Sequence, residues 1–341
     1  MFGKLTAWLI VLCISIAACS GNKDKALENQ SNNVDSLFLD ELHSRVLSQP
    51  SLSSATRLAK EEAEYAHSKK RYADETRALL TLYDIHLSRG SNLEALKFVK
   101  EACDVADSVP DARVKAKCLH SLGIVCSRLK NNTIASKNLA MSLHIYMALH
   151  DTVNYVRVRR DFARVYTDCF MFDSTSTICN VNINIDQQIS DIEGFACDYA
   201  MLGYNDISRY VKGLLFPDTL LLKSAYHNFK TAMIYNSDAK SRYASDLIAL
   251  GMTDVYYNMA NAETDNVERR SMLQDSCLYW LSHALKIAIG IDDNDRTVRY
   301  NIEKLDIYLD KGEIEYVRTY VDSLVLEAQN NPTNLLANKI A

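Results

Sequence analysis

Apolar positions along this chain follow the spacing of amphipathic helices, and the same order of residue types returns at a longer interval. The best preserved columns are Leu119, Leu122, Gly123, Cys126, Ala135, Leu139 and Ser142. The same columns hold Leu79, Leu82, Tyr83, His86, Ala95, Val99 and Ala102 one period of 40 residues earlier, and Leu39, Leu42, His43, Val46, Ala55, Ala59 and Glu62 two periods earlier. This recurrence predicts an array of helix pairs that bury their apolar faces against one another.

Interruptions of the helical spacing divide the chain into about seven predicted pairs. Predicted helices cover residues 37–46, 53–69, 74–88 and 93–107, and later helices begin near Ala112, Thr133, Thr152 and Asp173. Pro50 and Gly90 fit the turns between the first helices. Thr133 is the expected N-cap of its helix.

Three later units depart from the pattern. In the fourth, Arg159 occupies a column that elsewhere holds a large apolar residue, so either the register shifts or the helix is partly exposed. The second helix of this unit, at residues 173–188, is rich in Thr, Asn and Ile. In the fifth unit the second helix arrives ten residues late, which indicates an insertion at residues 213–222. A polar stretch in the sixth predicts unusually long helices.

These columns resemble the tetratricopeptide repeat, in which a large residue, a Leu, a Gly or Ala and an aromatic lie on the first helix of each pair. The resemblance covers residues 34–330 and implies an all-α solenoid, or superhelix, of about seven antiparallel helix pairs. Gly123, Gly203 and Gly251 are the small residues that would let helices approach closely. Units of 40 residues are longer than the roughly 34 of the family. Ordinary helical hairpins without this ancestry are the alternative.

The N-terminus has the pattern of a secretory signal. Lys4 precedes an apolar run from Leu5 to Ala18, which is shorter than the roughly 20 residues of a spanning helix. We therefore expect residues 1–18 to be a signal peptide, with an uncleaved anchor as the alternative. The polar residues 19–33 are predicted to be a flexible tether, and residues 331–341 a C-terminal tail.

The end of the apolar run, Ile16-Ala17-Ala18-Cys19, resembles the lipobox of bacterial lipoproteins. By resemblance to lipoproteins of Gram-negative bacteria, Cys19 would carry the acyl chains and anchor the protein to a membrane. Ser20 in place of Asp would favour the outer membrane over the inner one. Which side of that membrane the protein faces is left open, and a coincidental cysteine in an ordinary signal peptide is the alternative.

Composition and charge narrow the classes of function. Ten Gly and four Pro among 341 residues suit a mostly helical chain. A net charge of -5 with scattered Lys and Arg disfavours nucleic-acid binding. Phosphate-binding loops and the zinc and serine-hydrolase motifs are not found, so we expect no enzymatic activity, no catalytic or metal site, and no cofactor besides the lipid on Cys19. Residues 292–295 are interpreted as an exposed turn that caps the next helix rather than a calcium loop.

The cysteines beyond Cys19 are an odd set without C-x-x-C spacing. They are Cys103, Cys118, Cys126, Cys169, Cys179, Cys197 and Cys277. Because several fall on columns that need compact apolar side chains, we expect most to be buried and unpaired rather than a disulfide framework.

A candidate binding site lies in the fourth and fifth units. Arg157, Arg160 and Arg164 are spaced by three and four residues, which places them on one face of a helix. With Tyr204 at the corresponding place in the next unit, they could bind an acidic or carboxylate-bearing segment. A solvated basic face without a ligand is the alternative.

The resemblance implies a protein or peptide partner, whose identity the sequence does not give. The first hypothesis is a membrane-tethered adaptor in the cell envelope. The array also resembles the extracytoplasmic repeat half of membrane-linked transcriptional regulators, so a sensor component is the second hypothesis. A nutrient-binding lipoprotein is a third, since 19 Tyr would suit an aromatic pocket.

Overall fold

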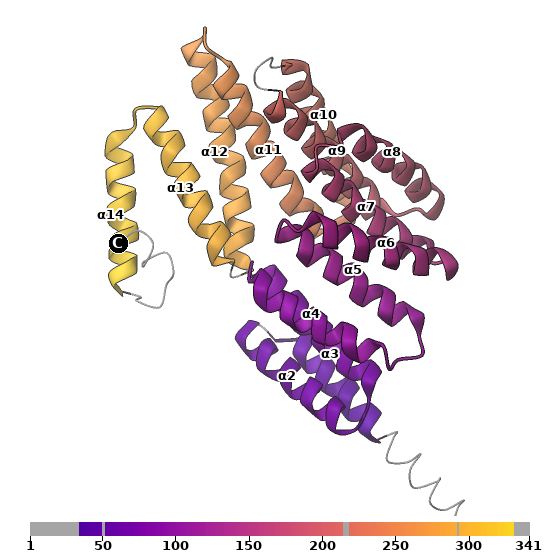
Figure 1. Cartoon of the computed structure of the whole chain (residues 1–341). Coiled ribbons are helices and arrows are strands. Elements are labelled where there is room, and N and C mark those ends of the chain that lie inside the picture. Colours follow the sequence, from indigo (N-terminus) through magenta and orange to yellow (C-terminus); the bar gives the residue numbers. More distant parts are fainter. Residues whose placement is uncertain (1–33, 50–51, 214–217, 292, 331–341) are drawn as a thin grey trace, which may run out of the picture. The chain divides into compact units, whose positions relative to one another are not determined.

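The computed structural model describes residues 34–49, 52–213, 218–291 and 293–330 (Figure 1). All regular elements in these residues are α-helices, which confirms the all-α class. A first helix spans residues 34–47. The others are α2 (Leu52–Ser68), α3 (Tyr72–Ser88), α4 (Asn92–Ala106), α5 (Ala112–Arg128), α6 (Asn132–Ala148), α7 (Thr152–Asp168), α8 (Phe172–Ile189), α9 (Ile192–Lys212), α10 (Thr219–Ala239), α11 (Arg242–Ala262), α12 (Val267–Gly290), α13 (Asn294–Asp310) and α14 (Ile314–Asn330).

The short turns between helices explain the repeat period. Lys130, His150, Phe170 and Ser190 all have φ between 53° and 61°, and they recur every 20 residues, half of the 40-residue period. A left-handed residue ends a helix by letting the next amide groups reach back to its last carbonyls. After α5, for example, Asn131 N donates to Cys126 O at 2.9 Å. The third and fourth repeats therefore each consist of two helices that end in the same way.

Side-chain caps start many of the helices. Asp111, Asp151 and Asp191 each accept a hydrogen bond from a backbone N–H in the first turn of the helix that follows. The expected N-cap at Thr133 is wrong, because Thr133 lies inside α6 and the Asn131 side chain accepts from Ile134 N at 3.3 Å. The left-handed residue Lys130 ends α5 one position before that cap.

The chain divides into two compact units, Met1–Leu82 and Tyr83–Ala341. In the described part of the first unit, Leu39, Leu42 and Leu58 are buried together with Glu62, a carboxylate without exposed surface. Glu62 accepts from the Arg77 guanidinium at 3.3 Å and contacts His43 at 3.0 Å. A buried charge is thus paired inside this unit.

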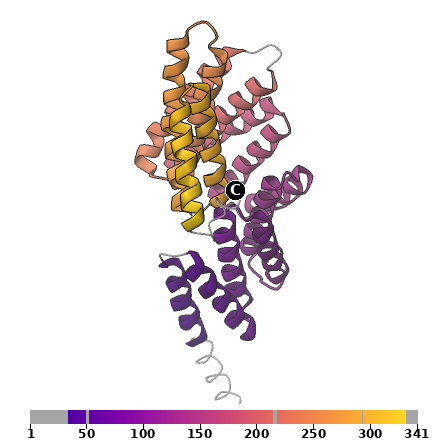
Figure 2. The ribbon, with the colours of Figure 1, turned by 90° about the vertical axis from the view of Figure 1, so that its left-hand side faces the viewer.

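In the second unit, consecutive helices pack against one another as antiparallel pairs, among them α5 with α6, α9 with α10, and α11 with α12 (Figures 1 and 2). Phe229 is buried between two glycines, and a Cβ atom would lie 2.7 Å from its ring at Gly203 and 2.0 Å from it at Gly251. A Cβ at Gly123 would lie 2.7 Å from Leu139. The expected role of these three glycines in close helix approach is confirmed.

Helix length accounts for much of the irregular spacing in the later units. The helices α9, α10 and α11 each have 21 residues and α12 has 24, against 17 in α5, α6 and α7. This confirms the long helices expected in the sixth unit. Of the insertion expected at residues 213–222, residues 214–217 lie outside the described residues; Leu220 is exposed and Leu222 is buried in α10.

The fourth unit keeps its register despite Arg159. The Arg159 guanidinium lies 5.7 Å from the centre of the Tyr155 ring and is half-buried, so this face of α7 is partly exposed. In the next helix, Thr175, Asn182 and Asp186 have no exposed surface. The polar composition of α8 therefore reflects a polar interior rather than a solvent-facing helix.

The described cysteines are free, and five of them, Cys118, Cys126, Cys179, Cys197 and Cys277, are buried. The expectation that most are small core residues is confirmed for this part of the chain. Cys169 is exposed and Cys103 half-buried. Cys19, the predicted signal peptide and tether at residues 1–33, and the predicted tail at residues 331–341 lie outside the described residues. Among the described helices, none combines the length and apolar character needed to cross a bilayer.

Candidate functional site

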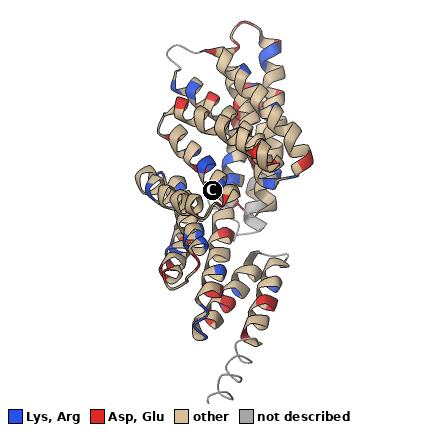
Figure 3. Ribbon diagram, turned by 90° about the vertical axis from the view of Figure 1, so that its right-hand side faces the viewer, with Lys and Arg blue, Asp and Glu red and all other residues tan. Residues whose placement is uncertain are grey.

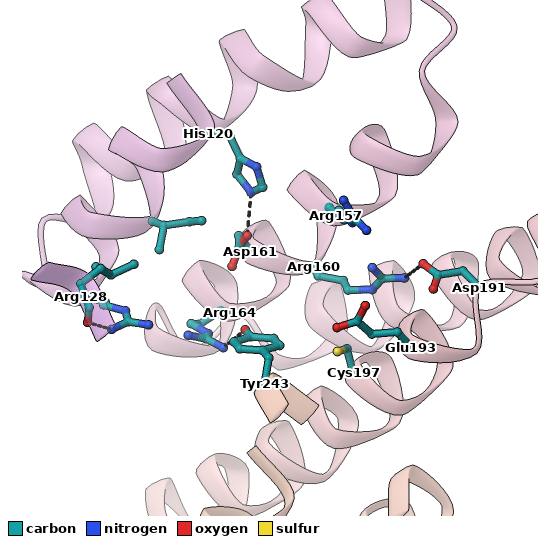
Figure 4. Close-up of a pocket in the computed structure, with 12 residues that line it drawn as sticks. His120, Arg128, Arg157, Arg160, Asp161, Arg164, Asp191, Glu193, Cys197 and Tyr243 are labelled. Atoms are coloured by element: carbon teal, nitrogen blue, oxygen red, sulfur yellow. Dashed lines mark hydrogen bonds and ion pairs between the residues drawn. The ribbon is translucent and has the colours of Figure 1, made fainter. Parts of the chain in front are cut away.

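A cavity of about 310 Å³ lies in the second unit, where the first helices of successive pairs face one another (Figure 4). It is lined by Leu87 from α3, by His120, Ile124 and Arg128 from α5, by Arg157, Arg160, Asp161 and Arg164 from α7, by Asp191, Glu193 and Cys197 at the start of α9, and by Tyr243 at the start of α11. Four of these side chains are arginines, so the lining is rich in hydrogen-bond donors.

The structure brings together most of the site residues predicted from sequence. Arg157, Arg160 and Arg164 all line the cavity, as their helical spacing indicated. Tyr204 does not line it; its side chain is 37% exposed elsewhere on α9, and burial of the ring raises the pKa of its hydroxyl. Tyr243, which the sequence analysis missed, supplies the aromatic side chain of the cavity.

Arg160 is already occupied by carboxylates of the protein itself. Its Nε atom donates to Asp198 at 2.8 Å and its Nη2 atom donates to Asp186 at 2.6 Å, and both aspartates have no exposed side-chain surface. Asp191 lies 3.5 Å from the same Nη2 atom. Burial opposes the charge of Arg160, but the neighbouring Asp198 and Asp186 outweigh it and raise its pKa. Arg160 is therefore paired with carboxylates of the protein itself, and its contact with a partner stays a prediction.

Arg164 is held by an aromatic side chain from a helix two pairs further on. Its Nη2 atom donates to the Tyr243 hydroxyl at 2.5 Å, and its guanidinium lies 5.9 Å from the centre of that ring. Tyr243 and then Asp161 favour the charged form and raise the pKa of Arg164. Tyr243 brings no formal charge, and Arg164 forms no ion pair among the described residues, so its guanidinium stays positively charged at the cavity wall.

Arg128 and Arg157 supply further positive charge. Arg128 donates to the Leu87 carbonyl at 3.0 Å, and burial together with the nearby Arg164 lowers its pKa. Burial disfavours the charged form of the guanidinium, and the second guanidinium nearby adds repulsion between like charges. The Arg157 side chain is exposed, and in the described part of the chain it has no ion pair.

The acidic residues of the cavity are engaged by other groups. Asp161 lies 2.7 Å from His120 Nε2, and Glu193 accepts from the Ser241 hydroxyl at 2.6 Å. Burial alone would raise the pKa of Asp161, but the hydrogen bond with His120 and the nearby Arg164 outweigh it, and the net effect lowers that pKa. The lining therefore offers more unpaired positive than negative charge.

The lining also contains a thiol whose protonation state follows from its burial. Cys197 is the thiol of the cavity, and burial raises its pKa to about 12, so it stays protonated and weakly nucleophilic near neutral pH. The described residues contain no group of His, Cys, Asp and Glu arranged to hold a metal ion. Figure 3 shows Lys and Arg interspersed with Asp and Glu over the described helices, which makes the local excess of arginine at the cavity distinctive.

Comparison with known proteins supports the fold but assigns this chain to no family. No protein-family model matches this sequence. No curated protein is detectably similar to it in sequence. A Rap protein complexed with competence and sporulation factor superposes with a TM-score of 0.53 at 12% identity, over 90% of this chain and 96% of that one. The apo form of RapI gives a TM-score of 0.44 at 13% identity, over 78% of this chain and 94% of that one.

The similarity to the Rap complex confirms the tetratricopeptide-like arrangement of antiparallel helix pairs. An identity of 12% carries no residue of that protein's site over to this chain.

Proposed function

We propose that this protein is a lipid-anchored adaptor of the bacterial cell envelope that binds an acidic segment of a partner protein in the arginine-lined cavity. One observation carries the proposal: Arg128, Arg157 and Arg164 line a single cavity between successive repeats, and none of them forms an ion pair among the described residues. Guanidinium groups bind carboxylates through paired hydrogen bonds, so an acidic side chain or a C-terminal carboxylate is the expected ligand.

The fold supports this kind of partner. Arrays of helix pairs commonly use the face formed by the first helices to bind other proteins, and here that face holds the cavity. The Rap protein of similar fold was crystallised in complex with competence and sporulation factor, so an array of this arrangement can hold a bound factor. We propose no catalytic role, in keeping with the protonated thiol of Cys197.

The anchor is proposed from the sequence alone, because Cys19 precedes the described residues. The lipobox-like Ile16-Ala17-Ala18-Cys19 and the following Ser20 support acylation and an outer-membrane location. Cells that express the protein and take up labelled fatty acid should label it through Cys19. A Cys19→Ala variant that still carries the label would show that the protein is not a lipoprotein.

Capture of the partner tests the cavity. A photoreactive residue in place of Ile124, in the cavity wall, should crosslink the partner in intact cells, and mass spectrometry would identify it. We expect Arg128→Met with Arg164→Met to reduce the crosslinked product at least tenfold, because two charge-assisted contacts are lost.

Arg113→Met is the control. Arg113 lies on α5, the helix of Arg128, but it is largely exposed and does not line the cavity. The control should leave capture unchanged. Equal capture by the double variant and the control would overturn the proposed site. The identity of the captured protein separates the two functional hypotheses, because a signalling membrane protein would favour a sensor component over an adaptor.

A further inference from the structure

A buried polar network lies directly behind the cavity wall. Arg160 of α7 joins two aspartates from different helices, Asp186 of α8 and Asp198 of α9, and Asn182 donates to Asp198 at 3.1 Å. Asp186, Asp198 and Asn182 have no exposed surface, whereas Arg160 also lines the cavity. Arg160 thus lies between the cavity and the buried acids.

The network has too few hydrogen-bond donors for its oxygen atoms. Asp186 Oδ1 and Asn182 Oδ1 are buried and have no hydrogen-bond partner in the described structure. These residues lie one helical turn apart on α8. A carboxylate that binds a proton becomes a donor as well as an acceptor, so a proton on either aspartate would supply the donor that is missing.

The balance of charges also favours a proton on one of the two aspartates. Two fully buried carboxylates share one guanidinium, which leaves one uncompensated negative charge when both are ionised. Burial raises the pKa of Asp198 to about 7 despite Arg160, and it also raises the pKa of Asp186. Near neutral pH the pair therefore holds a proton in part of the molecules.

We propose that the Asp186–Asp198 pair takes up a proton when an acidic segment binds in the arginine-lined cavity, so that binding is tighter at lower pH. The inference rests on the proposed function, because it requires an anionic ligand beside Arg160. In this arrangement Arg160 and the two aspartates are positioning residues, and Arg128, Arg157 and Arg164 contact the ligand.

The physical cause is repulsion between like charges. A carboxylate roughly 10 Å from Asp198, in surroundings with an effective dielectric constant of about 20, changes the protonation equilibrium of Asp198 about tenfold. Starting from a half-protonated state at pH 7, this change corresponds to uptake of roughly 0.4 proton per ligand bound. The same change makes binding about fivefold tighter at pH 6 than at pH 8.

Other charged and titratable groups surround the network, and the experiment must separate their effects. They are Arg159 on α7, Cys179 on α8, and Asp191, Glu193 and Cys197 on α9. Across the cavity, His120 pairs with Asp161, Arg128 comes from α5 and Tyr243 from α11. Because His120 carries a titratable imidazole in the cavity lining, it needs a variant of its own.

Titration calorimetry of the purified protein with hexaglutamate measures the proton directly. At pH 7, the binding heat in two buffers of different ionisation enthalpy gives the number of protons taken up. The carboxyl groups of the peptide are ionised throughout this range and contribute none. We expect uptake of roughly 0.4 proton by the His120→Gln variant, and uptake near zero when Asp198→Asn is added.

Asp198→Asn keeps the shape of the side chain and mimics the protonated acid, so its affinity at pH 8 should approach that of the unsubstituted protein at pH 6. Asp186→Asn provides an independent variant with the same expectation. Hexaglutamate binding without proton uptake at pH 7, or with uptake unaffected by either substitution, would overturn this inference and leave the proposed function standing. No binding of hexaglutamate at any pH between 6 and 8 would overturn both.

Discussion

Replacing Arg160 by methionine should destabilise the second unit strongly, whereas the same change at Arg157 should not. The Arg160 side chain is 12% exposed and contacts Asp186 and Asp198, which are 0% exposed. Removing one partner of a buried ion pair costs about 3–5 kcal/mol, because the remaining charges stay desolvated and unpaired. Arg157 is exposed and without an ion pair in the described chain, so Arg157→Met should change stability by less than about 0.5 kcal/mol.

The stability lost in Arg160→Met should also depend on pH, and the direction of that dependence follows from proton binding. Without the guanidinium, the pKa of Asp198 rises further above its ordinary value of 3.8, since Arg160 is the main group that opposes the effect of burial. The folded protein then binds more protons than the unfolded chain, and stability falls as pH rises above about 4. The free energy of unfolding of Arg160→Met should therefore be closer to that of the unsubstituted protein at pH 5.5 than at pH 8.

Urea unfolding followed by circular dichroism at both pH values measures these differences. The double variant Arg160→Met with Asp198→Asn removes one of the stranded charges and should recover part of the loss at pH 8. Equal stability of Arg157→Met and Arg160→Met, or a deficit at Arg160 that does not change with pH, would refute the assignment of Arg160 as a buried structural charge.

Two further outcomes test the packing and the thiols. Gly251→Ala should lower stability by about 1–3 kcal/mol in the same urea assay, because its Cβ would lie 2.0 Å from the Phe229 ring; Gly290→Ala, where nothing lies within 4 Å, is the control and should not destabilise. A thiol reagent at pH 8 should modify the exposed Cys169 of the native protein first and Cys197 and Cys277 only on unfolding, since both are buried and burial raises each pKa to about 12. Early modification of Cys277 would contradict the described packing around it.

The fold could be predicted from sequence because its determinants are local. Helix spacing, a left-handed turn residue and a cap at Asp111 or Asp151 all lie within one or two helical turns of each other. Predicted and observed helix bounds in the first pairs accordingly differ by no more than a few residues, as for residues 74–88 against α3 (Tyr72–Ser88). The error at Thr133 arose because two adjacent Asn residues and a Thr all suit an N-cap, and only the position of the preceding turn decides among them.

The candidate site was only partly predictable, because its partners are distant along the chain. Helical spacing placed Arg157, Arg160 and Arg164 on one face, which the cavity confirms. The same spacing carries no information on which of them is neutralised, since Asp186 and Asp198 are 26 and 38 residues away from Arg160. Tyr243 is 79 residues from Arg164, and no local pattern joins them.

A signal for the buried network was nevertheless present in the sequence of α8. The Thr and Asn residues that made this helix look like a poor copy of the repeat occupy interior positions: Thr175 bonds Thr167 at 3.0 Å, and Asn182 bonds Asp198. Polar residues that fall on core columns cost stability unless they are paired. On this helix Asn182 and Asp186 have their partners in the buried network around Arg160, whereas Thr175 bonds a neighbouring threonine. Because Arg160 also lines the cavity, the polar residues of the least regular repeat help to position the cavity wall.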